Sequence, residues 1–103
     1  MVIEWSYRAR TDLRDLKAYI AKDSPYYAQR FIERIIAAVE KLIPFPKIGR
    51  SVPEAEDRDD VRELIFQGYR IIYCTLPERV VIVTILHGSL DLVTKEPKPW
   101  DVG

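Results

Sequence analysis

The sequence predicts an α+β fold, with an N-terminal helical hairpin packed on a small, mainly antiparallel β-sheet. Three observations lead to this prediction. The stretch from Val61 to Asp91 is rich in Ile, Val, Tyr and Thr, which favour strands. Residues 8–43 instead repeat their apolar side chains at helical spacing. Only short breaks divide the strand-forming stretch, and short connections join antiparallel neighbours.

The strand-forming stretch divides into three expected strands, Val61–Phe66, Tyr69–Leu76 and Val80–His87. Gly68 falls in the first break and Pro77 in the second. Proline has no N–H for a strand ladder, so Pro77 belongs in a turn. A fourth strand is expected at the start of the chain, Val2–Trp5, at or near an edge of the sheet.

Two amphipathic helices are expected between the first strand and the others. The first begins near Arg8, and its apolar stripe is Ala9, Leu13, Leu16 and Ile20. Ser24 suits an N-cap and Pro25 a first helical position, so the second helix is expected over Pro25–Ile43. The short connection between them makes an antiparallel hairpin.

The remaining segments are expected to be irregular. Residues 47–60 read as a polar loop, and its five acids, in Glu54–Asp60, are most simply solvated. Residues 92–103 form a tail whose prolines oppose a long helix, and Trp100 should either dock or serve a partner. We expect residues 1–103 to form a single domain with a tail that is flexible or docked.

Composition predicts an ordinary globular protein of the cytoplasm. Hydrophobic residues make up 48% and charged residues 31% of the chain. The N-terminus lacks the apolar region of a signal peptide, and no apolar run approaches the ~20 residues that span a bilayer. Net charge is zero, but residues 1–53 carry a net charge of +4 and residues 54–103 a net charge of −4. Nucleic-acid binders usually show a basic excess, which is absent here.

Most enzyme signatures are absent from the sequence. The chain has no glycine-rich phosphate loop, and its single His and single Cys argue against a metal site; we expect no cofactor. Cys74 is expected to be a small core residue. Ser89, His87 and Asp91 lie within five residues on one turn, which does not suit a catalytic triad.

Arg70 is the most informative charged position, because it interrupts the most strand-prone segment. It either pairs with a partner such as Glu63 on the neighbouring strand, or displays a cation that grips phosphate or carboxylate. The residues themselves favour pairing over display by about two to one. For His87, a structural hydrogen bond is favoured over catalysis.

Several short motifs, in this order over about 85 residues, resemble the RelE/ParE superfamily of bacterial toxins, the toxic halves of type II toxin–antitoxin pairs. The motifs are Ala9-x-x-Asp12-Leu13, Asp23-Ser24-Pro25, Pro46-x-x-Gly49-Arg50, Val61-Arg62-Glu63-Leu64, Tyr69-Arg70-Ile71-Ile72-Tyr73 and Ile85-Leu86-His87-Gly88-x-x-Asp91. The resemblance implies the same hairpin-on-sheet fold. It also implies one of two targets, messenger RNA in the ribosome for RelE-like members or DNA gyrase for ParE-like members.

The departures from the family pattern favour the ParE-like branch. Arg70 matches the strand arginine shared by many members, and it would be catalytic if the chain were a ribonuclease. Leu90 stands where a nuclease carries a further arginine, no tyrosine follows it, and Glu54–Asp60 offers no matching basic pair. Losing those groups should cost several kcal/mol of transition-state stabilisation. Leu90 also departs from the ParE-like pattern, which leaves an altered target or reduced potency open.

The resemblance therefore implies a gyrase-poisoning toxin of a plasmid-stabilisation module, neutralised by a cognate antitoxin that is ParD- or RelB-like, with an oligomer formed by the two. The alternatives are a ribosome-dependent endoribonuclease and a non-toxic antitoxin-binding module. No membrane partner is expected, and direct nucleic-acid binding by the chain alone is not expected. The candidate residues for target or antitoxin binding are Arg10, Arg14, Arg30, Arg34, Arg62, Arg70, His87, Asp91 and Trp100.

Overall fold

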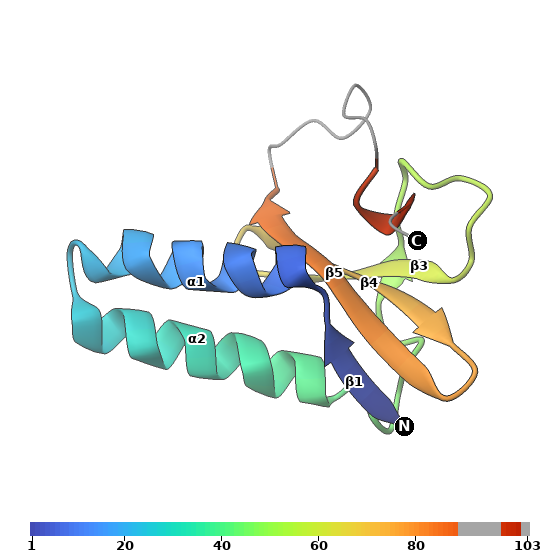
Figure 1. Cartoon of the computed structure of the whole chain (residues 1–103), viewed down its shortest axis with the longest axis horizontal. Helices are drawn as coiled ribbons and strands as arrows, with labels where there is room; N and C mark the ends of the chain where they lie inside the picture. Colours follow the sequence, from blue (N-terminus) through green and yellow to red (C-terminus); the bar gives the residue numbers. More distant parts are fainter. Residues whose placement is uncertain (89–97, 102–103) are drawn as a thin grey trace.

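Two antiparallel helices lie against one face of a five-stranded sheet in the computed structural model, which describes residues 1–88 and 98–101 (Figure 1). The elements follow the chain as β1 (Val2–Trp5), α1 (Tyr7–Ala21), α2 (Pro25–Glu40), β2 (Arg50–Ser51), β3 (Val61–Phe66), β4 (Tyr69–Leu76), β5 (Arg79–His87) and the short 3-10 helix η1 (Pro99–Asp101). The strand order is β1-β5-β4-β3-β2.

The sheet is mixed. β1 runs parallel to β5 at one edge, and the other three pairings are antiparallel. The predicted bounds of β3 and β4 are confirmed, and β5 begins one residue earlier than expected, at Arg79. The expectation that residues 47–60 are wholly loop was wrong, because Arg50 and Ser51 pair with Glu63 and Arg62 to form β2.

Both helices begin where a serine can cap them. Ser6 Oγ accepts a hydrogen bond from Ala9 N at 3.0 Å, and Ser24 Oγ accepts one from Tyr27 N at 3.1 Å, as expected for the second helix. The second helix was expected to reach Ile43 but ends at Glu40. The ring of a proline clashes with the preceding residue when that residue is helical. Pro44 therefore favours an end to the helix in this region.

Each face of the sheet buries its own apolar cluster. The helix-facing cluster joins the stripes of α1 and α2 to β4 and β5, with Ile35, Val39, Ile71, Tyr73 and Ile82 among its members. The opposite face carries a second cluster, whose members are Val52, Ala55, Val61, Ile72, Val83, Leu86 and Trp100. Trp100, which the sequence predicted would dock or serve a partner, is docked there and is 7% exposed.

No helix in residues 1–88 and 98–101 is both long and apolar enough to cross a bilayer. Over the same residues, no group of three or more His, Cys, Asp and Glu side chains is placed to hold a metal ion.

Candidate functional site

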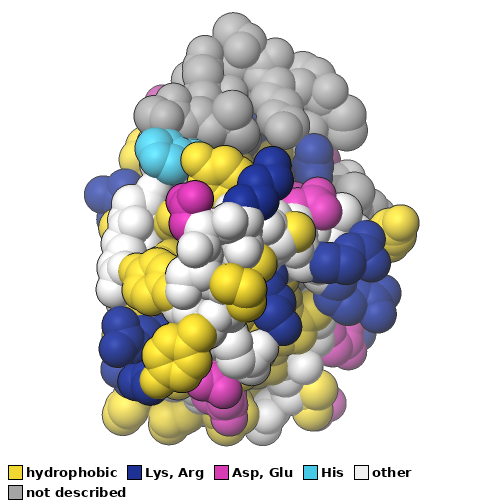
Figure 2. Space-filling model, turned by 90° about the vertical axis from the view of Figure 1, so that its left-hand side faces the viewer, with side chains coloured by type: hydrophobic (Ala, Val, Ile, Leu, Met, Phe, Trp, Pro, Cys, Tyr) yellow, Lys and Arg dark blue, Asp and Glu magenta, His cyan; other side chains and the backbone are white. Residues whose placement is uncertain are grey.

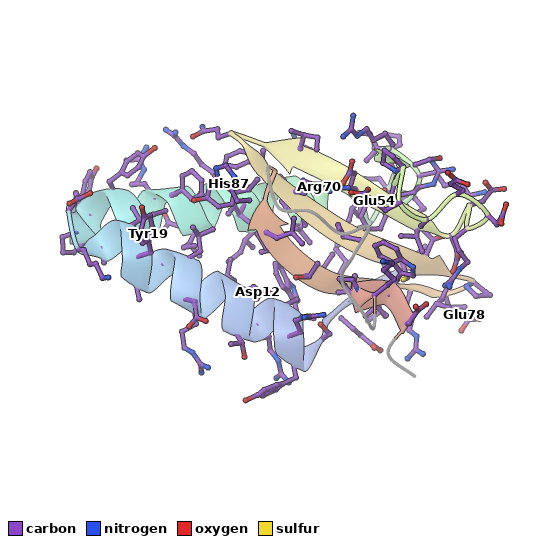
Figure 3. All side chains as sticks on the ribbon, turned by 90° about the horizontal axis from the view of Figure 1, so that it is seen from above. Asp12, Tyr19, Glu54, Arg70, Glu78 and His87 are labelled. Carbon is purple, nitrogen blue, oxygen red and sulfur yellow. The ribbon has the colours of Figure 1, made fainter. Side chains whose placement is uncertain are left out.

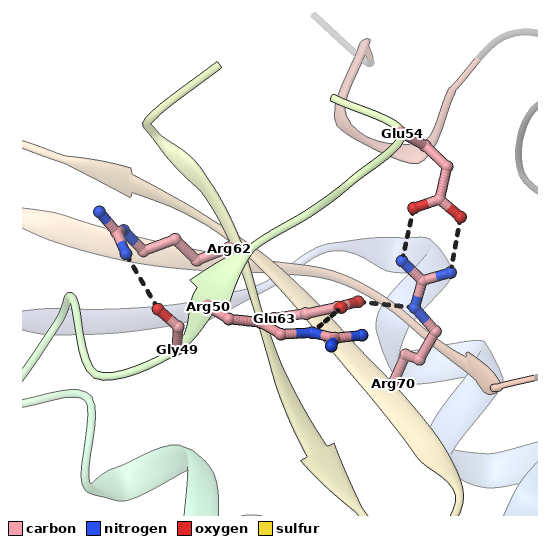
Figure 4. Close-up of polar contacts among 6 residues, drawn as sticks. All are labelled: Gly49, Arg50, Glu54, Arg62, Glu63 and Arg70. Atoms are coloured by element: carbon pink, nitrogen blue, oxygen red, sulfur yellow. Dashed lines mark hydrogen bonds and ion pairs between the residues drawn. The ribbon is translucent and has the colours of Figure 1, made fainter. Parts of the chain in front are cut away.

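Arg70 lies in β4 within a network of ion pairs on the sheet face that carries the second cluster (Figure 4). Its Nε donates to Glu63 Oε1 at 2.6 Å. Its two terminal nitrogens donate to the carboxylate of Glu54 at 2.7 and 2.9 Å, a two-point contact that uses the planar fork of the guanidinium. Figure 3 shows Glu54 directly beside Arg70. The pairing with Glu63 that the sequence favoured is therefore present.

A second arginine completes the network. Arg50 Nε donates to Glu63 Oε2 at 2.6 Å, so Glu63 bonds one arginine through each oxygen. Glu63 is 1% exposed, whereas the side chain of Arg50 is 61% exposed. Two arginines and two glutamates carry no net formal charge together. A carboxylate as buried as that of Glu63 requires such partners, because an isolated buried charge is very costly.

The hydrogen bonds between Arg70 and Glu54 stabilise the charged forms of both groups. Bonds from Arg70 lower the pKa of Glu54 below its usual value of 4.5, although burial opposes the change. The bonds to Glu54, followed by those to Glu63, raise the pKa of Arg70 above that of a free arginine. Arg70 therefore stays a cation, and its fork is occupied by a carboxylate of the same chain.

This geometry determines what Arg70 can do chemically. A surface hollow of about 380 Å³ lies beside the network, lined by both arginines, Glu54, Pro53 and Ile65 among others. Stabilising a developing oxyanion requires donors aimed at the place where the charge forms. The Arg70 fork is instead aimed at Glu54, so an incoming phosphate would have to displace that carboxylate.

The acidic segment Glu54–Asp60 is only partly the solvated loop that the sequence suggested. Glu54 is bonded to Arg70, and Asp60 receives two hydrogen bonds from Arg58, at 2.8 and 2.9 Å. Those bonds lower the pKa of Asp60. Glu56, Asp57 and Asp59 are exposed. The loop therefore uses two of its acids as structural contacts.

A second set of contacts holds Gly49 against β3 and β4. Gly49 N donates to the buried Tyr73 Oη at 2.9 Å, and Arg62 Nη1 donates to Gly49 O at 2.9 Å. A Cβ at Gly49 would stand 2.6 Å from both Glu63 O and Tyr73 Oη, so no side chain fits there. Burial raises the pKa of the Tyr73 hydroxyl. Arg62 is one of the candidate binding residues, and its hydrogen bond to Gly49 holds the segment before β2 in place.

Two other positions singled out in the sequence, His87 and Cys74, lie in surroundings that suit a structural role. His87 is exposed at the end of β5, with its ring 5.6 Å from that of Tyr69. Cys74 is half-buried, and burial raises the pKa of its thiol, which lowers its reactivity as a nucleophile. Asp91, together with Ser89 and Leu90, lies outside the described residues.

The four helical arginines Arg10, Arg14, Arg30 and Arg34 are exposed, as the sequence predicted. Figure 2 looks at the free end of the hairpin and shows Lys and Arg side chains in separate groups, with hydrophobic and neutral atoms between them. Arg30 Nη1 donates to Tyr26 Oη at 3.0 Å. The hairpin is therefore a mixed surface of cations and aromatic rings.

Sequence reasoning missed two partnerships. It did not connect Arg70 with Glu54, because the two lie 16 positions apart and one belongs to an irregular loop. It also did not connect Asp12 with β5, although Asp12 Oδ2 accepts hydrogen bonds from Thr84 Oγ1 and, at 3.1 Å, from Ile85 N, which tie α1 to β5. Asp12 stood in one of the recognised motifs, and that was the only available signal.

Comparisons with known proteins agree with the fold. Residues 3–92 match the family model described as the ParE toxin of the type II toxin–antitoxin system parDE. The chain is 33% identical over 88 residues to Toxin RelE2 of Caulobacter vibrioides, covering 84% of this chain and 94% of that protein. It is 35% identical over 87 residues to Putative toxin Y4kP of Sinorhizobium fredii, covering 84% and 86%.

A solved structure described as the chromosomal ParDE TA system from P. aeruginosa has the same fold. The TM-score is 0.68 at 20% identity, over 84% of this chain and 95% of that one. The family match spans most of the chain, from β1 to the residues after β5. This protein belongs to the ParE toxin family of type II toxin–antitoxin systems, within the RelE/ParE superfamily.

Proposed function

We propose that this toxin poisons DNA gyrase in the cytoplasm, as part of a stabilisation module whose cognate antitoxin neutralises it. The observation that carries the proposal is the closed guanidinium fork of Arg70. A ribonuclease needs cations free to hold phosphate and to stabilise the charge that develops on it. The strand arginine of this chain is bonded to two carboxylates, within a network of zero net formal charge.

Charge on the whole chain supports the same proposal. Sixteen basic residues balance sixteen acidic ones, so the chain lacks the basic excess that gives nucleic-acid binders most of their affinity. Binding another protein requires no such excess. The exposed tyrosines and arginines of the hairpin are residue types enriched in protein interfaces.

A supercoiling assay with purified gyrase tests the proposal directly. The purified toxin should inhibit supercoiling or accumulate cleaved DNA complexes, and adding a cognate antitoxin should reverse the effect. Normal supercoiling at toxin concentrations well above those of gyrase would refute the gyrase target. Normal growth after induction without antitoxin would instead favour the non-toxic antitoxin-binding module.

A ribosome-dependent endoribonuclease is the second candidate, because two of the relatives are named as RelE toxins. Mapping messenger RNA ends after induction distinguishes it from a gyrase poison. Cuts at codon positions that disappear in Arg70→Ala would favour the nuclease. Since loss of Arg70 is also expected to destabilise the fold, the double variant Arg70→Met with Glu63→Gln is a better test, because it removes the buried Glu63 charge together with Arg70.

The antitoxin is proposed to contact the cations of the hairpin, Arg10, Arg14, Arg30 and Arg34. An antitoxin segment that is acidic and folds as it binds would complement these charges, and such segments can wrap large surfaces. The complex is expected to be an oligomer of toxin and antitoxin.

A further inference from the structure

A cavity at the start of α1 takes no part in the Arg70 network. It is lined by residues of β1, α1, β4, β5 and η1 and of the loop before β3, and we refer to it as the α1–η1 cavity. Its volume is about 530 Å³, which lies within the range of small-molecule sites. It shares no lining residue with the hollow beside Arg70. It is therefore a separate feature of the sheet face that carries the second cluster.

Part of the cavity lining is apolar and buried. Val83 and Trp100 are 4% and 7% exposed and belong to the second cluster, and Cys74 and Val81 pack against that cluster. Tyr7, also in the lining, is 69% exposed. Aliphatic and aromatic side chains of this kind make up most of the lining in typical ligand pockets. They suit a ligand with an apolar body.

The charged part of the lining is unbalanced. Two of its arginines have acidic partners: Arg58 donates to Asp60 at 2.8 and 2.9 Å, and Arg79 donates to Glu4 at 3.2 and 3.3 Å. Arg8 also lines the cavity and is half-buried, and no carboxylate of residues 1–88 and 98–101 forms an ion pair with it. The lining therefore has one excess positive charge, on Arg8.

The position of Arg8 in α1 increases this imbalance. Arg8 is the second residue of the helix, and the first turn contains no acidic residue. A helix N-terminus carries a partial positive charge, which acidic side chains usually compensate. A cation that is partly removed from water beside this charge is stabilised by an anion. A ligand that places one negative charge beside Arg8 would compensate both.

We propose that the α1–η1 cavity binds a small organic monoanion with an apolar, ring-sized body. The anionic group pairs with Arg8, and the body contacts Val81, Val83 and Trp100. A single excess charge in the lining favours a monoanion, such as a carboxylate, over a phosphate dianion. Binding at this site requires neither gyrase nor an antitoxin, so it stands apart from the proposed function.

Titration of the full-length toxin with cinnamate, followed by nitrogen–proton correlation NMR, tests the site. The backbone amides of Val81 and Val83 and the indole N–H of Trp100 should shift and saturate, with a Kd of about 1 mM for a ligand of this size. Trp5 packs with the helix-facing cluster, so its indole N–H should not shift. Cinnamylammonium has the same ring but a positive charge, and acetate lacks the ring. Each should bind at least about tenfold more weakly than cinnamate.

Three variants assign the binding to the cavity. Arg8→Gln should raise the Kd for cinnamate about tenfold, because it removes the cation that pairs with the carboxylate. Lys17→Gln is the matched control: it removes an exposed cation of the same helix outside the cavity and should change the Kd less than about twofold. Val81→Phe narrows the cavity without changing its charge and should also raise the Kd about tenfold or more. Circular dichroism verifies that each variant is folded.

Several outcomes would overturn the proposal. One is the absence of saturation at cinnamate concentrations well above the expected Kd. Others are equal binding of cinnamylammonium, or shifts of Trp5 in place of Trp100. Unchanged affinity in Val81→Phe, or the same loss of affinity in Lys17→Gln as in Arg8→Gln, would also overturn it. If Arg8→Gln does not fold, Val81→Phe and the cinnamylammonium comparison test the cavity and its charge preference without it.

Discussion

Replacing Arg70 with methionine should destabilise the fold severely. Methionine keeps an unbranched chain in β4 but removes the hydrogen bonds that Arg70 donates to Glu54 and Glu63. The loss of Arg70 affects the two carboxylates unequally. The side chain of Glu54 is 16% exposed and can turn toward water, whereas that of Glu63 is 0% exposed and keeps only Arg50. The cost therefore arises mainly at Glu63.

Breaking a buried ion pair by removing one partner costs about 3–5 kcal/mol. Arg50 still bonds one oxygen of Glu63, so we expect the lower end, about 3 kcal/mol. The assay is urea unfolding followed by circular dichroism. If the free energy of unfolding falls by about 1.5 kcal/mol per molar of urea, the urea midpoint should fall by roughly 2 M.

A double-mutant cycle distinguishes a buried charge from lost packing. Glu63→Gln removes the buried charge that Arg70→Met leaves with Arg50 as its remaining arginine, so the double variant should recover about 1–2 kcal/mol relative to Arg70→Met alone. Two results would refute the reasoning. One is a loss below about 1 kcal/mol for Arg70→Met, and the other is a double variant less stable than either single variant.

Three further predictions concern Gly49, Glu54 and Cys74. Gly49→Ala should cost more than about 2 kcal/mol and lower the melting temperature by roughly 10 °C, because its Cβ would meet two oxygens at 2.6 Å. Gly68→Ala, at φ +87° in open space, should cost only about 1 kcal/mol, and equal losses would contradict the close approach. Because its folded-state pKa lies below 4.5, Glu54 contributes stability above that pH and loses it as pH falls; urea midpoints of Glu54→Gln should therefore depend less on acid than those of the unmodified chain. Cys74 should react with iodoacetamide at pH 7.5 several-fold more slowly than in urea-unfolded chain, and equal rates would contradict the raised pKa and burial of its thiol.

Local patterns predicted most of the fold. The bounds of β3 and β4 follow from Gly68 and Pro77 at the breaks and from strand-forming residues between them. The start of α2 follows from the Ser24 cap and Pro25, which act within one helical turn. β2 could not be predicted, because two residues carry no periodicity, and it exists only through its pairing with β3.

The site was predictable only in part. Arg70 could be singled out because a charge in the middle of a strand needs a partner, and Glu63 was in reach on the neighbouring strand. Glu54 could not be identified among five acids of one loop, since no local rule states which of them folds back onto the sheet. The cations of the hairpin were correctly placed on the surface, because the apolar stripe of each helix predicts which side chains face outward.

The sequence by itself determined the order and type of the main elements, because caps, prolines and apolar periodicity act over a few residues. Only the tertiary structure decided which charges meet and which edge stays open. The Arg70–Glu54 contact joins residues distant along the chain, and its distance depends on packing across the whole sheet. That packing leaves Arg70 engaged within the molecule and the outer edge of β3 without a strand beside Leu64–Phe66 in the described residues.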